Sequence, residues 1–121
     1  MKKLRFNNTY DSGKLTFIMF KEGNKYTAVC LEFDLLTQAK NPKAAEERIS
    51  DYAKAWLTNV KKNKLSEKLL NQPAPQKYWK IYQKMLEEEQ RRLSTQAETK
   101  HNSGYIAAHL VPYNQNAFAF S

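Results

Sequence analysis

The amino-acid sequence predicts an α+β fold, in which a three-stranded antiparallel sheet and a late strand carry one main helix on one face, with an inserted helical segment. Three observations predict it. Two runs rich in aromatic and branched residues are joined by Gly23 and Asn24, the pattern changes to a helical period after Asn41, and a strand-like run returns near the end. At 121 residues the chain has room for one domain, 1–121, with residues 61–104 as the insertion before the final strand.

The three early strands are expected at Leu15 to Lys21, Tyr26 to Phe33 and Leu35 to Ala39. The pair Gly23 and Asn24 supplies the positive φ that a tight hairpin turn needs. Apolar side chains alternate onto both faces of these strands, and the second strand places three together on one face: Val29, Leu31 and Phe33. One helix covers only one face of a sheet, so we expect later helices or another chain to cover the second.

The main helix is expected to begin at Pro42. Asn41 can accept hydrogen bonds from the free amides of a helix start, and Pro42 suits the first helical position because its missing N–H has no partner to lose there. Apolar residues then recur at spacings of three and four: Ala45, Ile49, Tyr52, Ala53, Trp56, Leu57 and Val60. The helix is therefore expected to pack one face on the sheet.

The last part of the chain predicts a second long helix and a final strand. Pro73 and Pro75 end any preceding helix, and residues 77–96 follow with apolar residues on one side: Trp79, Tyr82, Leu86 and Leu93. Residues 105–113 are expected to form the final strand, and residues 117–121 a short strand or tail.

Composition indicates a folded protein without a metal or cofactor site. Apolar residues make up 41% and charged residues 26% of the chain, as in soluble domains. No apolar run approaches the length of a membrane span, and the charged start lacks the apolar centre of a signal peptide, so we expect a cytoplasmic protein. Cys30 is the single cysteine, and one cysteine with two distant histidines offers no thiolate metal cluster.

The net charge of +8 is unevenly distributed along the chain. Residues 15–60 hold six basic and six acidic residues, so the excess lies in the flanking segments. Basic flanks attract a polyanion, which makes nucleic-acid binding through the amino terminus and the helical segment the alternative function. Its candidate residues are Lys61, Lys62, Lys64, Lys77, Lys80 and Lys84. Aromatic residues beside them could stack on bases, but their helical spacing favours core packing.

No residue is predicted to be catalytic. Cys30 lies in an expected strand, where a free cysteine behaves as a small apolar side chain, and neither His101 nor His109 is close to it in sequence. Glu32 and Asp34 form a pair of acids that could bind Mg²⁺ in a nuclease, but such a site requires further converging acids. Solvation of a strand end is the favoured interpretation of the pair, and the nuclease hypothesis is the least favoured function.

The run "YTAVCLEFDLLTQA", the helix-starting "NP" and the amphipathic helix after it are similar to the HicB-like family. The resemblance covers about residues 14–60, and "YIAAHLV" within 105–113 resembles the last strand of that family. It implies a βββαβ fold, a reduced relative of the ribonuclease H architecture without its catalytic carboxylates. The intervening helical segment departs from the family pattern, and residues 61–121 show no helix-turn-helix pattern, so we expect no operator-binding domain within these residues.

The resemblance implies a non-catalytic antitoxin that binds and occludes a small ribonuclease toxin of the HicA-like kind, or another protein partner. Members of the family are often dimeric, so we expect a homodimer. The residues assigned to partner binding are Glu32, Asp34 and Gln38. The overall basic charge opposes encounter with a basic, RNA-binding toxin, although the neutral segment at residues 15–60 reduces that repulsion.

Overall fold

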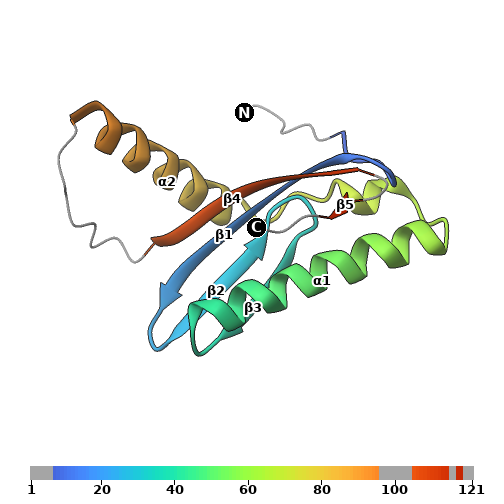
Figure 1. Ribbon diagram of the computed structural model, residues 1–121, viewed down its shortest axis with the longest axis horizontal. Coiled ribbons are helices and arrows are strands. Elements are labelled where there is room, and N and C mark those ends of the chain that lie inside the picture. The colour runs from blue at the N-terminus through green and yellow to red at the C-terminus, as the bar shows by residue number, and fades with distance from the viewer. Residues whose placement is uncertain (1–6, 96–104, 115–116, 119–121) are drawn as a thin grey trace.

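A computed structural model describes residues 7–95, 105–114 and 117–118. It confirms the predicted α+β class: an antiparallel sheet of strand order β3-β2-β1-β4-β5 is combined with two long helices (Figure 1). The strands are β1 (Gly13–Glu22), β2 (Lys25–Cys30), β3 (Leu35–Ala39), β4 (Tyr105–Asn114) and β5 (Ala117–Phe118). The helices are α1 (Pro42–Lys62), the short 3₁₀ helix η1 (Glu67–Leu70) and α2 (Gln76–Thr95).

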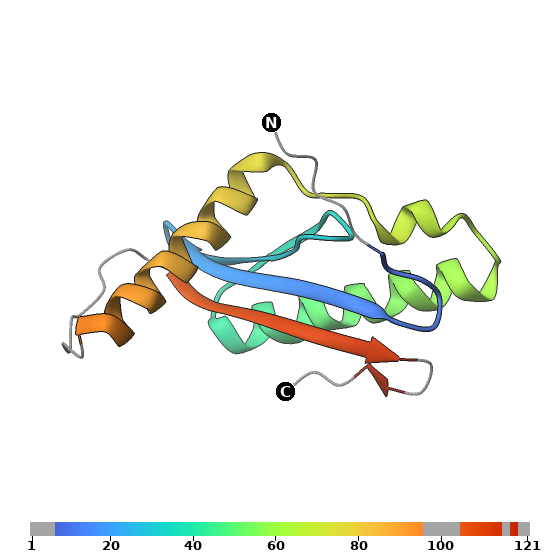
Figure 2. The same ribbon diagram turned by 90° about the horizontal axis from the view of Figure 1, so that it is seen from above.

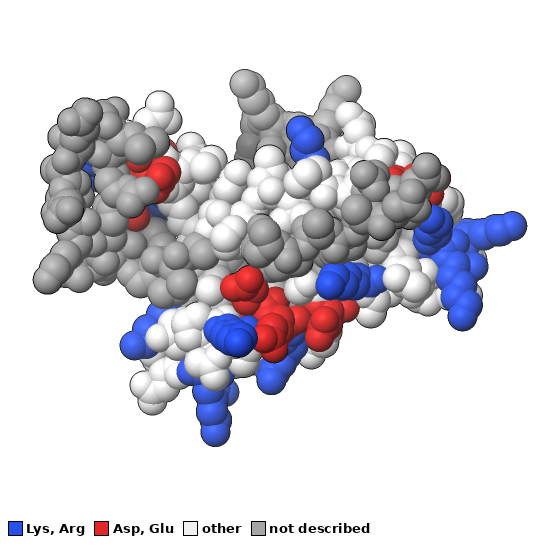
Figure 3. Space-filling model, viewed as in Figure 1, with Lys and Arg blue, Asp and Glu red and all other residues white. Residues whose placement is uncertain are grey.

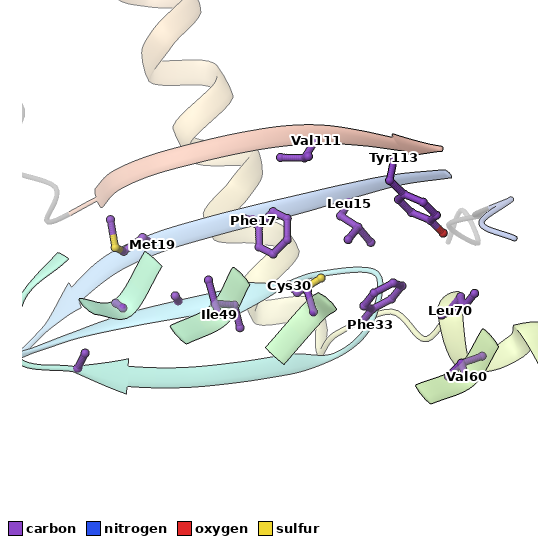
Figure 4. Packing of buried hydrophobic residues seen from close by; sticks show 14 residues of the cluster. Leu15, Phe17, Met19, Cys30, Phe33, Ile49, Val60, Leu70, Val111 and Tyr113 are labelled. Carbon is purple, nitrogen blue, oxygen red and sulfur yellow. The ribbon is translucent and has the colours of Figure 1, made fainter. Parts of the chain in front are cut away.

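The hairpin of β1 and β2 forms as predicted, with Gly23 at a φ of 60° in the turn. The second strand ends earlier than predicted, because Leu31 to Asp34 form a turn in which Asp34 has a φ of 55°. The prediction that Phe33 shares a face with Val29 and Leu31 is therefore wrong. The turn sends the Phe33 side chain to the opposite face, into the same cluster as Cys30 (Figure 4).

The helix α1 begins at Pro42, as predicted, and Asn41 caps it by accepting a hydrogen bond from the N–H of Ala44 at 2.8 Å. Its buried residues pack on one face of the sheet, in a cluster that contains strand and helix residues (Figure 4): Leu15, Phe17, Cys30, Ala45, Ile49, Ala53 and Val60. Tyr52 departs from the predicted apolar stripe, because its side chain is 47% exposed. It lies beside the core rather than in it.

The second face of the sheet is covered by α2 of the same chain. Ile18, Phe20, Val29 and Leu31 form a second cluster with Met85, and residues of α2 pack against it: Tyr78, Trp79, Ile81 and Tyr82. Figure 2 shows α1 running along the strands, whereas α2 crosses them at one end of the sheet. The apolar stripe of α2 differs from the predicted one, since Leu86 is 49% exposed and Met85 is buried. The side chain of Leu93 lies outside the described residues.

A segment between α1 and α2 fixes where α2 begins. The N–H of Ala74 donates to the carbonyl oxygen of Leu31, and the N–H of Gln72 donates to that of Glu32, both at 2.8 Å. Asn8 and Asn71 hold the start of the chain to this segment by reciprocal bonds between side-chain amide and backbone. In the described part of the chain, no helix has the length and apolar character needed to cross a membrane.

Candidate functional site

The turn at residues 31–34 carries two of the predicted partner-binding residues, and the structure places them in opposite environments. The side chain of Glu32 is only 4% exposed. Its carboxylate accepts hydrogen bonds from the N–H of Thr16 at 2.6 Å and from the Thr16 hydroxyl at 2.7 Å. Asp34 is exposed at the end of the turn. Asp34 is therefore available to a partner, whereas Glu32 holds the turn to β1 from inside the fold.

Burial sets the ionisation of Glu32. Desolvation raises the pKa of its carboxyl group, and the hydrogen bonds from Thr16 only partly oppose that shift. Each oxygen of this carboxylate already accepts from Thr16. A divalent metal would have to displace those bonds inside the fold. Within the described residues, His, Cys, Asp and Glu side chains form no group of three that could hold a metal ion.

Cys30 is fully buried in the cluster beneath α1. Burial, with a smaller contribution from the charge of Glu32, raises the pKa of its thiol well above the ordinary value. A cysteine nucleophile reacts as the thiolate, which this environment disfavours. The chemistry of Cys30 is thus that of a core residue, as the sequence indicates.

Gln38, the third predicted partner-binding residue, lies on β3, which forms one edge of the sheet. Its exposed side-chain amide donates to the hydroxyl of Thr27 at 3.1 Å. Its backbone carbonyl oxygen accepts from the guanidinium of Arg48 at 2.7 Å. Leu36, two residues earlier, is 45% exposed. Asp34 and Gln38 are thus brought together on one exposed edge that also carries an apolar side chain.

The first half of α1 carries a group of acidic residues that the sequence analysis did not single out. Glu46, Glu47 and Asp51 all lie in the first half of the helix, outside its buried stripe. Figure 3 shows acidic atoms gathered over α1 with basic side chains around them. The spacing that places these acids off the apolar stripe was the available signal. We name Glu46, Glu47 and Asp51 the acidic group.

The lysines of the alternative hypothesis fall into two separate sets. Lys61, Lys62 and Lys64 lie exposed at the end of α1, where Lys61 forms an ion pair with Asp11 at 3.0 Å. The second set, Lys77, Lys80 and Lys84, is exposed along α2. The neighbouring aromatic residues Tyr78, Trp79 and Tyr82 pack against the sheet. They form part of the core, so the favoured interpretation of their helical spacing holds.

One open hollow lies on the face of the sheet that α1 covers. Phe17, Met19 and Ile49 contribute to its apolar lining, with Glu46 and His109 at its polar positions. His109 is exposed on β4. The other histidine, His101, lies outside the described residues.

Comparison with known proteins provides no relative for this arrangement. No family model matches the chain, and no curated protein or solved structure matches it.

Proposed function

We propose that this chain is a non-catalytic, HicB-like antitoxin-type protein that binds and occludes a small ribonuclease toxin of the HicA-like kind or another protein partner. The observation that carries the proposal is the order of elements. Three consecutive antiparallel strands are followed by α1, and β4 then pairs with β1. We interpret this order as the βββαβ arrangement that the sequence resemblance implies, with η1 and α2 as an insertion before β4.

The acidic group answers the objection from net charge. A toxin that binds RNA presents a basic surface, and a chain of net charge +8 repels it at long range. Glu46, Glu47 and Asp51 provide an acidic surface for such a partner on the segment whose charges balance. Local complementarity of this kind governs encounter rates and orientation more than overall charge does.

The buried environments of Cys30 and Glu32 support a binding role rather than a catalytic one. A thiol with a strongly raised pKa is a poor nucleophile, and a carboxylate occupied by Thr16 has little capacity for a metal ion or a substrate proton. The mechanism is accordingly steric occlusion of the partner's active surface.

Co-expression tests the proposal. The open reading frames on either side of the gene are expressed singly, and one of them is expected to arrest growth unless this protein is co-expressed. The purified neighbour should cleave RNA, and this protein should inhibit the cleavage stoichiometrically. Growth arrest that co-expression does not relieve, or neighbours without any such activity, would count against the proposal.

A charge-reversal pair identifies the surface. The double variant Glu47→Lys, Asp51→Lys should slow association with the toxin by about tenfold or more, because it removes the attractive charges. The matched control, Glu87→Lys with Glu89→Lys, makes the same change in net charge on α2, where both residues are exposed. Equal slowing by the two variants would show that only net charge matters and would exclude the acidic group as the docking surface.

The nucleic-acid alternative retains one supporting observation. Lys77, Lys80 and Lys84 are exposed at spacings of three and four on α2, so they lie on one side of that helix. Such a row can follow a phosphate backbone.

A further inference from the structure

We propose that the open edge of β3 pairs with β3 of a second copy of this chain, in antiparallel orientation about a two-fold axis at Thr37. The pairing would join two sheets into one continuous sheet and place the two α1 helices side by side. This inference goes beyond the proposed function, because occlusion of a toxin requires only one copy. It is carried by the hydrogen-bonding direction of β3, the position of α1 and the distribution of charge.

Backbone groups of β3 point outward at two positions. In an antiparallel ladder, the N–H and C=O of one residue point to the same side, and the side alternates along the strand. The carbonyl of Gln38 accepts from Arg48, and β3 has β2 on one side only. The backbone groups of Gln38, and of Leu36 two residues before it, therefore point away from β2. An outermost strand with groups in this direction is a template for another strand.

A two-fold axis at Thr37 matches these groups to each other. The axis places Leu36 of one copy opposite Gln38 of the other. The backbone N–H of each of these residues then donates to the backbone carbonyl oxygen of the other. The two-fold symmetry produces a second, equivalent pair from Gln38 of the first copy and Leu36 of the second. The Gln38 carbonyl has two lone pairs and can accept from the second copy while keeping its bond to Arg48. Leu36, which is 45% exposed, is covered in the same step.

The position of α1 suits this pairing. The helix packs over both β2 and β3, so its axis lies about one strand spacing from the proposed two-fold axis. Strands lie about 4.8 Å apart, so the two α1 axes would be separated by about 9.6 Å. Packed helices have interaxial distances of about 8–10 Å. The two β3 strands and the two α1 helices can therefore make contact in the same dimer.

The side chains on this side of α1 are complementary across the same axis. Arg48 of α1 contacts Gln38 and therefore lies at about the same height along β3. A helix rises about 1.5 Å per residue and a strand about 3.3 Å, so one residue of β3 corresponds to about two residues of α1. Because α1 runs back along β3, Thr37 lies level with about residue 50 of the helix. The two-fold axis then brings Arg48 level with Tyr52 of the second copy. Tyr52 is 47% exposed, and a guanidinium over its ring would form a cation–π contact.

Charge favours a second copy as the occupant. Asp34 and Lys40 stand three residues on either side of Thr37 and are both exposed, so each would face the opposite charge at the ends of the paired strands. The segment 15–60, which contains both β3 and most of α1, has six basic and six acidic residues. Two such surfaces therefore meet with little net repulsion, although each whole chain carries +8.

Sedimentation equilibrium over a wide range of protein concentration tests the pairing. The wild-type protein should form a dimer, and Leu36→Lys should weaken self-association by about tenfold or more, because a charged side chain replaces the covered leucine. The matched control is Leu86→Lys. Leu86 is also exposed, at 49%, but lies on α2 and not on a strand of the sheet. A monomeric wild type, or equal effects of the two variants, would overturn the proposal.

Charge variants test the register of the pairing. Lys40→Glu should weaken the dimer, because it places two acids together, and the effect should diminish in high salt. Adding Asp34→Asn to the same chain removes the repulsion and should restore part of the affinity. Asn tolerates the positive φ that Asp34 adopts, so the second change should leave the turn intact. No restoration would contradict the register.

Disulfide trapping gives a direct readout. Thr37 would face Thr37 of the second copy in a non-hydrogen-bonded pair, in which Cα atoms lie about 4.5 Å apart, within the range that a disulfide spans. Thr37→Cys should therefore give a covalent dimer on mild oxidation, while Gln38→Cys and the wild type should not. If the protein is instead monomeric and amide protection of β3 appears only when a toxin is added, the edge belongs to that partner and the proposal of a second copy fails.

Discussion

Glu32 connects three parts of the chain through one turn. Its carboxylate holds Thr16 of β1, its backbone carbonyl accepts from Gln72, and Leu31 beside it accepts from Ala74. The turn thereby fixes both the end of β2 and the segment that leads into α2. A surface acid could not do this, so the burial of Glu32 has a structural purpose.

Replacing Glu32 by alanine should lower the free energy of unfolding by about 2 kcal/mol or more, because the buried N–H and hydroxyl of Thr16 lose their acceptors. Urea unfolding followed by circular dichroism measures the change. Glu47→Ala, at an exposed position on α1, should remain within about 0.5 kcal/mol of the wild type. Equal effects of the two substitutions would contradict the structural assignment of Glu32.

The raised pKa of Glu32 predicts a dependence of stability on pH. Because the folded protein holds this proton more tightly than the unfolded chain, the stabilisation is fully present below the unfolded pKa and is lost as pH rises through the folded pKa. The variant Glu32→Gln lacks this titration. Its free energy of unfolding relative to wild type should therefore increase as the pH rises from about 4, near the ordinary glutamate pKa, into the neutral range. A difference that stays constant over this range would exclude the shift.

At the scale of elements, local chemistry made the helix start and the third strand predictable. Asn41 and Pro42 mark the first turn of α1 by capping and by a fixed φ, and both are properties of single residues. The turn that diverts Phe33 was not predictable in the same way. Its cause is a long-range pair, in which Leu31 donates to Thr16 and the Glu32 side chain returns to the same residue. Alternation along the run gives no sign of that contact.

The phase of α2 was likewise set by tertiary packing. Met85 and Leu86 are adjacent apolar residues, and either could belong to an amphipathic stripe. The crossing of α2 over Ile18 and Val29 buries Met85 and leaves Leu86 half exposed. Periodicity predicts that a helix has an apolar face, but the exact boundary of that face depends on the surface it meets.

This difference in burial predicts unequal effects of two neighbouring substitutions. Met85→Ala should destabilise the protein by about 2 kcal/mol or more, because it removes a buried side chain and leaves a cavity under α2. Leu86→Ala should have an effect of about 0.5 kcal/mol or less, since its side chain is largely solvated. Chemical denaturation of the two variants under the same conditions measures both values. The reverse order would mean that α2 meets the sheet with its other side.

At the scale of the whole molecule, charge and shape separate two kinds of surface. The β3 edge and the first half of α1 hold balanced charges and exposed Leu36 and Tyr52, whereas the end of α1 and the outer side of α2 are rich in lysine. The sequence predicted the neutral segment and its basic flanks. It could not predict that Glu32 would be withdrawn from the candidate surface while the acidic group would join it, because that depends on how α1 packs over the edge strand.

Because these two surfaces are separate, we expect that substitutions on α2 can weaken binding to nucleic acid without weakening inhibition of the toxin. Lys77→Gln, Lys80→Gln and Lys84→Gln together remove three charges from one side of α2, where the aromatic residues beneath them remain in the core. The triple variant should elute from a phosphate-rich column at lower salt than the wild type, and the slope of log affinity against log salt should become shallower.

The same triple variant should still inhibit the toxin stoichiometrically, because the acidic group lies on α1, which packs on the opposite face of the sheet. If the neighbouring gene product is no longer inhibited while the variant folds normally, the lysine row of α2 contributes to the occluding surface. If inhibition was never present and RNA binding in the wild type is tight and steeply salt-dependent, the nucleic-acid function replaces the antitoxin proposal. Retained inhibition with reduced retention on the column is the result that the arrangement of charges on this fold leads us to expect.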